Sequence, residues 1–267
     1  MDSSTRVALR EPRVHETAIV DRSARLADDV VVGPYSIIGP DVELGPGCRV
    51  DSHVRLDGPL VAGANNRIFH GAALGAIPQD LKFAGARSGV RIGDGNVFRE
   101  FVTVNRATAE GAVTQIGNRI LFMAYVHVAH DCIVRDDAIL ANSVNLAGHV
   151  EVDEHAVVGG VTAVHQFVHI GAYSIIGGES KVTKDMPPFF KAAGNPLRVV
   201  GPNVVGLDRN GFSIEVRRVV KEAFRLLYRS DLNVTQAIER IRQDLPPIPE
   251  IRRLLEFIKR SRRGITR

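Results

Sequence analysis

The sequence predicts a parallel β-helix followed by a small domain of α-helices, and two periodicities support that prediction. Between Val20 and Val182, 24 of the 28 positions spaced six residues apart are Val, Leu, Ile or Phe, although all apolar types together make up 45% of the chain. Neither an α-helix, with its period of 3.6, nor an isolated β-strand, with its period of 2, produces a strict six. A six-residue repeat is a signature of parallel β-helices. After Val182 the repeat stops and helical spacing replaces it.

Each six-residue repeat supplies one short strand and one bend. Three repeats close a triangular prism, so residues 18 apart stack in columns about 4.8 Å apart. Glycine often follows the inward residue, as at Gly33 and Gly39, where a bend favours positive φ. One coil cannot bury its own inward face, so stability comes from stacking coils. Prisms of this kind resemble left-handed parallel β-helices, and the expected handedness rests on that resemblance.

Two stretches interrupt the six-residue register, residues 75–90 and 105–115. They place Asp80 and Glu110 at inward positions. An unpaired charge is too costly inside a narrow apolar prism, so we expect both stretches to leave it as loops. Loops on a rigid scaffold commonly carry function.

The C-terminal part has a pattern of its own. Four prolines indicate a linker after the last repeat: Pro187, Pro188, Pro196 and Pro202. Three segments with helical spacing follow, at residues 216–227, 234–241 and 251–258. Ser213 and Asn233 are suitable N-caps. We therefore expect a β-helix over residues 1–190 and a helical domain over 191–267.

The charge of the chain is unevenly distributed. The net charge is +4, but from Lys184 onward 18 Lys and Arg stand against 9 Asp and Glu, a net of +9, which leaves −5 for the rest. This basic tail indicates either an ordinary solvated surface or a docking face for an acidic partner. Nucleic acid is disfavoured as a partner, because aromatic residues make up only 6% of the chain and no binding motif is present.

Cysteine usage and hydropathy predict a cytoplasmic protein. Cys48 and Cys132 are more than four coils apart, too far to form a disulfide. The N-terminus is polar, and no apolar run of 18 residues occurs. We expect no stable membrane insertion.

Six of the nine histidines are concentrated in one part of the repeat region. They are His127, His130, His149, His155, His165 and His169, and none occupies the inward register. Steps of 18 place His130, Gly148 and Gln166 in one column, and they place His149 above Asp131. We therefore expect a polar cluster on one part of the prism wall.

His130 is the strongest catalytic candidate in this cluster. Asp131 follows it, and Gly148, one coil above, offers a backbone N–H to a developing oxyanion. We interpret His155 and His169 as exposed wall residues. A metal site is the competing hypothesis, because zinc-dependent carbonic anhydrases share this fold and use two histidines five residues apart. No two histidines here have that spacing, so we expect neither a metal nor another cofactor.

Several stretches closely resemble the UDP-N-acetylglucosamine O-acyltransferase family. They are Val126–Val134, Ile139–His149, Gly159–Phe167, Pro78–Gly85, Gly206–Ser213 and the helical tail, so the resemblance covers nearly the whole chain. Its most specific parts are the His-x-x-His-Asp-Cys run and the Gln-Asp-Leu-Lys loop. The family transfers an R-3-hydroxyacyl group from acyl carrier protein to the glucosamine 3-hydroxyl of UDP-N-acetylglucosamine, the first step of lipid A biosynthesis in Gram-negative bacteria.

The resemblance implies a role for each matching residue. His130 would be the general base, Asp131 would orient it, and the Gly148 N–H would stabilise the oxyanion. The implied substrate-binding residues are Gln79, Asp80, Lys82, His127, His149, His165, Gln166, Gly178, Asn203 and Arg209.

Within this set, the resemblance assigns different parts of the substrates to different residues. Gln79, Asp80 and Lys82 would hold the sugar and the acyl hydroxyl, and Asn203 and Arg209 the nucleotide. Gly178 would meet the end of an acyl chain near 14 carbons. The cleft would lie between subunits of a homotrimer, and the acidic acyl carrier protein would be the partner of the basic tail.

Two positions depart from the family pattern. Val205 stands where a glutamate is common, and Asn105 where a histidine is often found. The first departure leaves the contacts to the nucleotide open, and the sequence does not decide between a 3-hydroxyl and a 3-amino acceptor.

Three other functions compete with this one. The related N-acyltransferases carry a globular domain before the β-helix, whereas the repeats here begin by Val20. Small acetyl-CoA-dependent transferases would not explain the loop from Gln79 to Lys82. A structural β-helix without chemistry would not explain why His130, Asp131 and Gly148 occur together.

Overall fold

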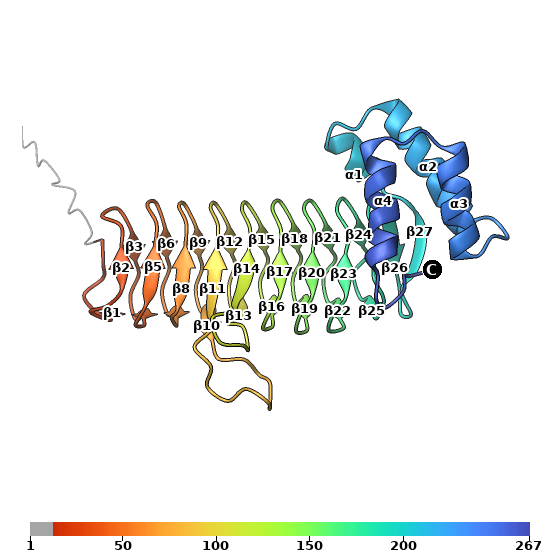
Figure 1. Cartoon of the computed structure of the whole chain (residues 1–267). Helices are drawn as coiled ribbons and strands as arrows, with labels where there is room; N and C mark the ends of the chain where they lie inside the picture. Colours follow the sequence, from red (N-terminus) through yellow and green to blue (C-terminus); the bar gives the residue numbers. More distant parts are fainter. Residues whose placement is uncertain (1–12) are drawn as a thin grey trace, which may run out of the picture.

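The structure, a computed structural model, describes residues 13–267 and confirms the predicted β-helix. The strands wind into a left-handed prism with three faces, and within each face the repeat strands pair in parallel. The helices gather at the C-terminal end of the prism (Figure 1). Most of the polar N-terminal segment discussed above lies outside the described residues.

Face 1 consists of β1 (Ile19–Val20), β4 (Ile37–Ile38), β7 (Arg55–Leu56), β10 (Ala73–Ala76), β13 (Thr103–Asn105), β16 (His127–Val128), β19 (Asn145–Leu146), β22 (Ala163–Val164) and β25 (Lys181–Val182). Face 2 consists of β2 (Arg25–Leu26), β5 (Val42–Leu44), β8 (Leu60–Ala62), β11 (Gly89–Ile92), β14 (Val113–Ile116), β17 (Ile133–Val134), β20 (Glu151–Val152) and β23 (His169–Ile170).

Face 3 consists of β3 (Val31–Val32), β6 (Arg49–Val50), β9 (Arg67–Ile68), β12 (Val97–Phe98), β15 (Leu121–Phe122), β18 (Ile139–Leu140), β21 (Val157–Val158), β24 (Ile175–Ile176), β26 (Phe190–Ala193) and β27 (Arg198–Pro202). The bend that leads from face 1 to face 2 is called corner 1–2 below; corners 2–3 and 3–1 are named in the same way.

The register of the strands follows the predicted 18-residue coil. His127 pairs with Asn145, and Asn145 pairs with Ala163. The inward residues are buried, and Phe98 and Phe122 stack with ring centroids 4.8 Å apart. Cys48 and Cys132 are both buried and free.

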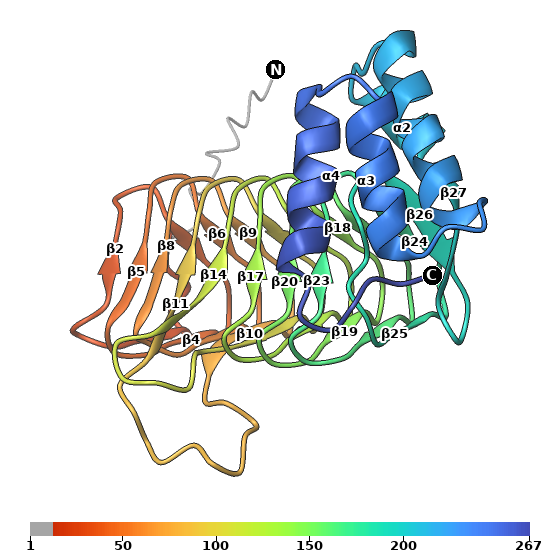
Figure 2. The same ribbon diagram turned by 45° about the vertical axis from the view of Figure 1, so that its right-hand side comes forward.

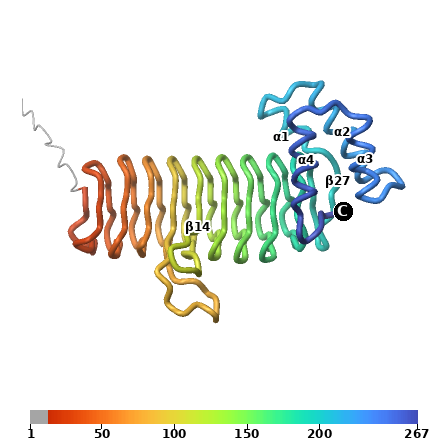
Figure 3. Tube along the Cα trace, in the orientation of Figure 1, coloured from red at the N-terminus to blue at the C-terminus, as the bar shows by residue number. Residues whose placement is uncertain are grey.

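The two interrupted stretches leave the prism as loops, as predicted. The longer loop runs from residue 77 to 88, between β10 and β11, and projects away from the stacked coils (Figures 1 and 3). The shorter one runs from 106 to 112, between β13 and β14. The loops contact each other, because the backbone N–H of Arg87 donates to the Glu110 carboxylate at 2.8 Å. Glu110 is exposed on the shorter loop, outside the apolar interior.

The segment that we interpreted as a proline-rich linker contains two strands. β26 pairs in parallel with β24, and β27 pairs antiparallel with β26, so face 3 extends beyond the last repeat. Pro196 lies in the turn between the two strands, and Pro202 is the last residue of β27. The proposed domain boundary at residue 190 coincides with the start of β26, and the division into two domains stays a prediction.

Four helices follow: α1 (Val204–Arg209), α2 (Ile214–Tyr228), α3 (Val234–Asp244) and α4 (Pro249–Arg260). The three predicted helices are confirmed as α2, α3 and α4, and both predicted N-caps form, Ser213 on Val216 and Asn233 on Gln236. α1 was not predicted, because six residues with one buried side chain, Leu207, show no periodicity. No helix within residues 13–267 is long and apolar enough to cross a membrane.

Helix α4 lies against the C-terminal strands of face 2 (Figure 2). The guanidinium of Arg253 pairs with the carboxylate of Glu154, and the ring of Phe257 lies 4.6 Å from that of His169. The chain then returns to the prism, where the Thr266 N–H donates to the Asp185 carbonyl at 2.8 Å. These contacts attach the helices to the end of the β-helix.

Candidate active site

His130 and Asp131 lie at corner 1–2, in the bend between β16 and β17. Asp131 has φ of 60°, in the left-handed region that aspartate tolerates better than most residues. This conformation turns the chain from face 1 to face 2 within four residues. It leaves both side chains on the outside of the prism.

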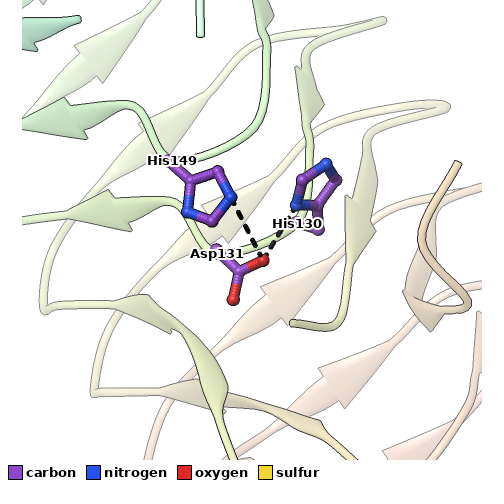
Figure 4. Close-up of side chains that lie close together, drawn as sticks. All are labelled: His130, Asp131 and His149. Carbon is purple, nitrogen blue, oxygen red and sulfur yellow. Dashed lines mark hydrogen bonds and ion pairs between the residues drawn. The ribbon is translucent and has the colours of Figure 1, made fainter. Parts of the chain in front are cut away.

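The two side chains form a hydrogen-bonded pair (Figure 4). His130 Nδ1 lies 2.9 Å from Asp131 Oδ2, and the side chains are only 15% and 14% exposed. An ionised carboxylate can only accept, so the His130 proton belongs on Nδ1 and the lone pair on Nε2. A lone pair on Nε2 is what a general base requires.

Two threonines hold Asp131 in place. The Thr108 hydroxyl donates to Oδ2 at 2.7 Å, and the Thr108 N–H lies 3.2 Å from the same oxygen. The Asp131 N–H donates to the buried Thr114 hydroxyl at 2.9 Å. Burial raises the pKa of Asp131, but hydrogen bonds from Thr108 and His130 outweigh it, so the pKa lies below its usual value and the group is ionised at neutral pH.

Gly148 lies directly beside the His130 ring, as the predicted column requires. A Cβ at position 148 would stand 2.4 Å from His130 Cε1 and 2.6 Å from Nε2, so only glycine fits without displacing the imidazole ring. Within residues 13–267, the Gly148 N–H donates to no acceptor. It is therefore free to donate to a bound oxyanion.

Further histidines surround the pair. His149 Nε2 lies 3.8 Å from Asp131 Oδ2, and its ring stacks on Phe167 with centroids 4.5 Å apart. His127 contacts the Thr103 hydroxyl through Nδ1 at 2.7 Å. Burial, and to a smaller extent the neighbouring His130, lower the pKa of His127, which favours a neutral ring. His165 and Gln166 are exposed two coils above the pair.

Other predicted site residues lie elsewhere in the chain. Gln79, Asp80 and Lys82 occupy the longer loop, where the Lys82 N–H donates to the Asp80 carboxylate at 2.9 Å. Gly178 lies at corner 3–1. Within residues 13–267, no hydrogen bond or ion pair joins any of these four residues to His130.

Asn203 and Arg209 bound helix α1. Asn203 caps the helix through the Gly206 N–H at 3.1 Å and donates to the carbonyl of Tyr173 at 2.8 Å, so α1 is fixed beside corner 2–3. Arg209 and Val205 are exposed. A single chain therefore does not bring the α1 residues together with His130.

The interpretation of His155 and His169 as exposed wall residues is wrong. Both are half-buried, because His155 stacks on Tyr173 at 4.7 Å and His169 is covered by Phe257 of α4. The step of 18 residues from His155 to Tyr173 could have indicated the first contact, whereas Phe257 reaches His169 from helix α4, which no periodicity connects to the repeats.

The donor atoms of His130, Asp131 and His149 lie within 4.8 Å of one another, a spacing that would also admit a metal ion. Asp131 Oδ2 already accepts hydrogen bonds from Thr108 and His130, which a metal would have to displace. The contacts suit an oriented base better than a metal ligand set. The absence of a metal from the reaction stays a prediction.

Proteins of known identity resemble this chain along most of its length. The acyl-[acyl-carrier-protein]–UDP-N-acetylglucosamine O-acyltransferase of Thermodesulfovibrio yellowstonii is 46% identical over 255 residues, which cover 95% of this chain and 99% of that protein. The enzyme of the same name from Synechocystis is 46% identical over 234 residues, 88% of this chain and 85% of that protein. The chain belongs to the UDP-N-acetylglucosamine O-acyltransferase family.

Family models and solved structures agree with this assignment. A model described as UDP N-acetylglucosamine O-acyltransferase, domain 2, matches residues 185–266, and a model of six bacterial transferase hexapeptides matches residues 23–58. The LpxA structure from Acinetobacter baumannii has a TM-score of 0.92 and 42% identity, covering 96% of this chain and all of that one. The O-acyltransferase structure from Moraxella catarrhalis has the same TM-score and 40% identity over the same shares. The resemblance seen in the sequence is confirmed, and the protein is an acyltransferase of this family.

Sequence reasoning missed Thr108 and Thr114 as part of the UDP-N-acetylglucosamine O-acyltransferase site. Thr108 precedes Asp131 by 23 residues, so it does not fall in the 18-residue column. The shorter loop changes the length of this coil, and no periodic signal spans it. The position of Thr108 in a stretch that breaks the register was the only feature of the sequence that could have indicated a role.

Proposed function

We propose that this protein transfers an R-3-hydroxyacyl group from acyl carrier protein to the glucosamine 3-hydroxyl of UDP-N-acetylglucosamine, the first step of lipid A biosynthesis. The names of its relatives supply the donor and the acceptor. The observation that carries the proposal is the His130–Asp131 pair beside the free N–H of Gly148. We expect the reaction in the cytoplasm, without stable membrane insertion.

In the proposed reaction, His130 Nε2 takes the proton of the acceptor hydroxyl while that oxygen attacks the thioester carbon. The carbonyl oxygen becomes an oxyanion that the Gly148 N–H stabilises, an effect worth about 3–4 kcal/mol for one such donor in other enzymes. The intermediate then collapses, the C–S bond breaks, and protonated His130 returns the proton to the thiolate. The Asp131 carboxylate stabilises the imidazolium between these two steps.

The dispersed site residues support a homotrimer. The loop with Gln79, Asp80 and Lys82, the wall at Gly178 and the α1 residues Asn203 and Arg209 are not joined to His130 within one chain. His127, His149, His165 and Gln166 line an outer wall, which needs a second surface to become a cleft. Copies related by three-fold symmetry would bring one chain's wall to another chain's loop or α1.

Acyl carrier protein is the proposed partner of the basic tail. Arg253 is not part of that docking face, because its guanidinium already pairs with Glu154. Arg252 and Lys259 on the same helix are exposed. Changing both to Glu should raise the KM for the acyl donor and weaken the salt dependence of association. The double variant R22E/R49E, at the other end of the prism, is the matched control and should keep the wild-type KM.

Gly178 is the proposed limit of the acyl pocket. It has no side chain, and its neighbour one coil below is Gly160. We expect a donor near 14 carbons, and Gly178→Met should shift the preference toward shorter chains, since each buried CH₂ contributes about 0.8 kcal/mol. A wild-type preference for 10 carbons would show that another residue limits the length.

Mass spectrometry of the reaction products tests the proposed function directly. Purified protein is incubated with R-3-hydroxyacyl carrier proteins of several lengths and with UDP-N-acetylglucosamine or its 3-amino analogue. We expect an ester on the 3-oxygen. If only the 3-amino analogue were acylated, giving an amide, the natural acceptor would be a 3-amino sugar nucleotide and not UDP-N-acetylglucosamine. If neither acceptor were acylated, the proposed function would be rejected.

A further inference from the structure

Thr108 is a half-buried residue of the shorter loop, and it makes two hydrogen bonds to the carboxylate of Asp131. Its hydroxyl donates to Oδ2 at 2.7 Å, and its backbone N–H lies 3.2 Å from the same oxygen. This oxygen also accepts from His130 Nδ1. The orientation of the carboxylate therefore depends on Thr108 as much as on His130.

The loop that carries Thr108 is itself held to the prism. The Arg106 guanidinium donates to the Gly58 carbonyl at 2.9 Å, and the Asn105 amide donates to the Ile77 carbonyl at 2.9 Å. Ile77 begins the longer loop, which carries Gln79, Asp80 and Lys82. One anchored segment thus connects the base of that loop to the His130–Asp131 pair.

We propose that Thr108 is a positioning residue, which holds Asp131 so that His130 keeps its proton on Nδ1 and its lone pair on Nε2. The inference rests on the proposed role of His130 as general base. Thr108 touches neither the reacting atoms nor His130 itself. It acts through the carboxylate, whose rotation would break the hydrogen bonds to the Thr108 hydroxyl and to His130 together.

Removing the hydroxyl should change the proton affinity of the pair in a defined direction. Two other titratable groups face the His130–Asp131 pair: His149, whose Nε2 lies 3.8 Å from Asp131 Oδ2, and His127 on β16, next to His130. In Thr108→Val the backbone N–H still contacts Asp131, but the carboxylate has one donor fewer. Without that donor the carboxylate can rotate away from Nδ1, so it stabilises protonated His130 less and the ascending limb of the pH–rate profile moves to lower pH.

Kinetics of Thr108→Val, Thr108→Ser and the exposed helix variant Thr235→Val test the proposal. We expect Thr108→Val to lower kcat by about 5- to 50-fold through misplacement of the base, with KM within about twofold. Thr108→Ser should restore both kcat and the pH profile, and Thr235→Val should match the wild type. An unchanged kcat and pH limb in Thr108→Val, or no rescue by serine, would overturn the assignment.

Nitrogen-15 NMR of the histidine rings tests the same inference without any reaction. The His130 signals, identified by their loss in His130→Gln, should report the Nδ1–H tautomer in wild type and in Thr108→Ser. Thr108→Val should populate the Nε2–H tautomer measurably. If this shift occurs in a protein that transfers no acyl group, the positioning role stands and the proposed reaction fails. An unchanged tautomer in Thr108→Val rejects the positioning role, whatever the activity.

Discussion

Two histidine–aspartate pairs on this prism have nearly equal lengths and different surroundings. At corner 1–2, His130 Nδ1 lies 2.9 Å from Asp131 Oδ2. On face 2, His169 Nε2 lies 3.0 Å from Asp153 Oδ1. The second aspartate also contacts Arg135 at 3.1 Å and Arg253 at 3.8 Å.

The two histidines differ in which ring nitrogen lies near the aspartate and in what covers the rest of the ring. His130 uses Nδ1 for the carboxylate and keeps Nε2 beside the Gly148 backbone. His169 has its Nε2 near the aspartate but makes no hydrogen bond with it, and Phe257 of α4 covers its ring. A His–Asp contact therefore does not by itself make a base. Which ring nitrogen faces the aspartate, and what covers the rest of the ring, distinguishes the proposed catalytic pair from the pair beside helix α4.

The largest expected effect comes from removing the imidazole at corner 1–2. His130→Ala should lower kcat by about 10²–10⁴-fold, because the variant lacks the imidazole proposed to take the proton from the acceptor hydroxyl. The side chain lies outside the apolar interior, so the variant should fold normally, which circular dichroism and thermal unfolding can check. Substantial remaining activity would show that His130 is not the general base.

The two aspartates should respond in opposite ways to replacement by asparagine. Asp131→Asn should lower kcat by about 10²- to 10⁴-fold, because an amide can donate to Nδ1 and place the proton on Nε2. Asp153→Asn should leave kcat within about twofold. Steady-state kinetics of both variants measure the contrast, and equal losses would mean that the face 2 pair also serves catalysis.

Asp153→Asn should instead lower stability, in a manner that depends on pH. Burial raises the pKa of Asp153, but His169, Arg253 and Arg135 outweigh it, so its pKa lies below the usual value. A carboxylate whose pKa is lowered by folding stabilises the native state fully when the pH lies above its unfolded pKa of about 3.9. This contribution is lost as the pH falls through the native pKa. We expect a loss of about 1–3 kcal/mol at pH 7, measured by urea unfolding.

The matched measurement at low pH tests the cause of that loss. Wild type and Asp153→Asn should converge in stability as the pH falls from about 3.9 through the lower native pKa of Asp153, where the wild-type carboxyl becomes protonated. A difference that stays constant with pH would mean that packing, and not charge, attaches α4.

A smaller effect is expected at a third histidine. His155 stacks on Tyr173, and its Nε2 lies 3.7 Å from Asp137, so His155→Ala removes surface contacts at corner 2–3. We expect kcat within about threefold of wild type and a stability loss below about 1 kcal/mol. A loss of activity comparable to that of His130→Ala would refute the separate assignment of these two histidines.

The smallest effect is expected from chelators. The proposed steps use an imidazole, a carboxylate and a backbone N–H, so prolonged treatment with EDTA should leave kcat and the thermal midpoint unchanged. Loss of activity that added Zn²⁺ restores would show that His130, Asp131 and His149 hold a metal.

The repeating part of this protein could be predicted from its amino-acid pattern. Apolar residues at intervals of six predict the prism, and steps of 18 predict that Gly148 stacks on His130 and His149 on Asp131. These contacts could be read in advance because every uninterrupted coil has the same length, so there sequence distance translates directly into height along the axis.

Contacts that cross an interruption of the repeat could be recognised only in the folded protein. Thr108 reaches Asp131 through a coil whose length a loop has changed, and Arg253 reaches Glu154 across 99 residues. The strands β26 and β27 and the short helix α1 are likewise defined by what they pack against. A periodic pattern fixes neighbours within a repeat, whereas contacts between a repeat and a loop or a docked helix depend on how separate surfaces fit. For that reason the sequence predicted His130 as the base but not the contact between Thr108 and Asp131.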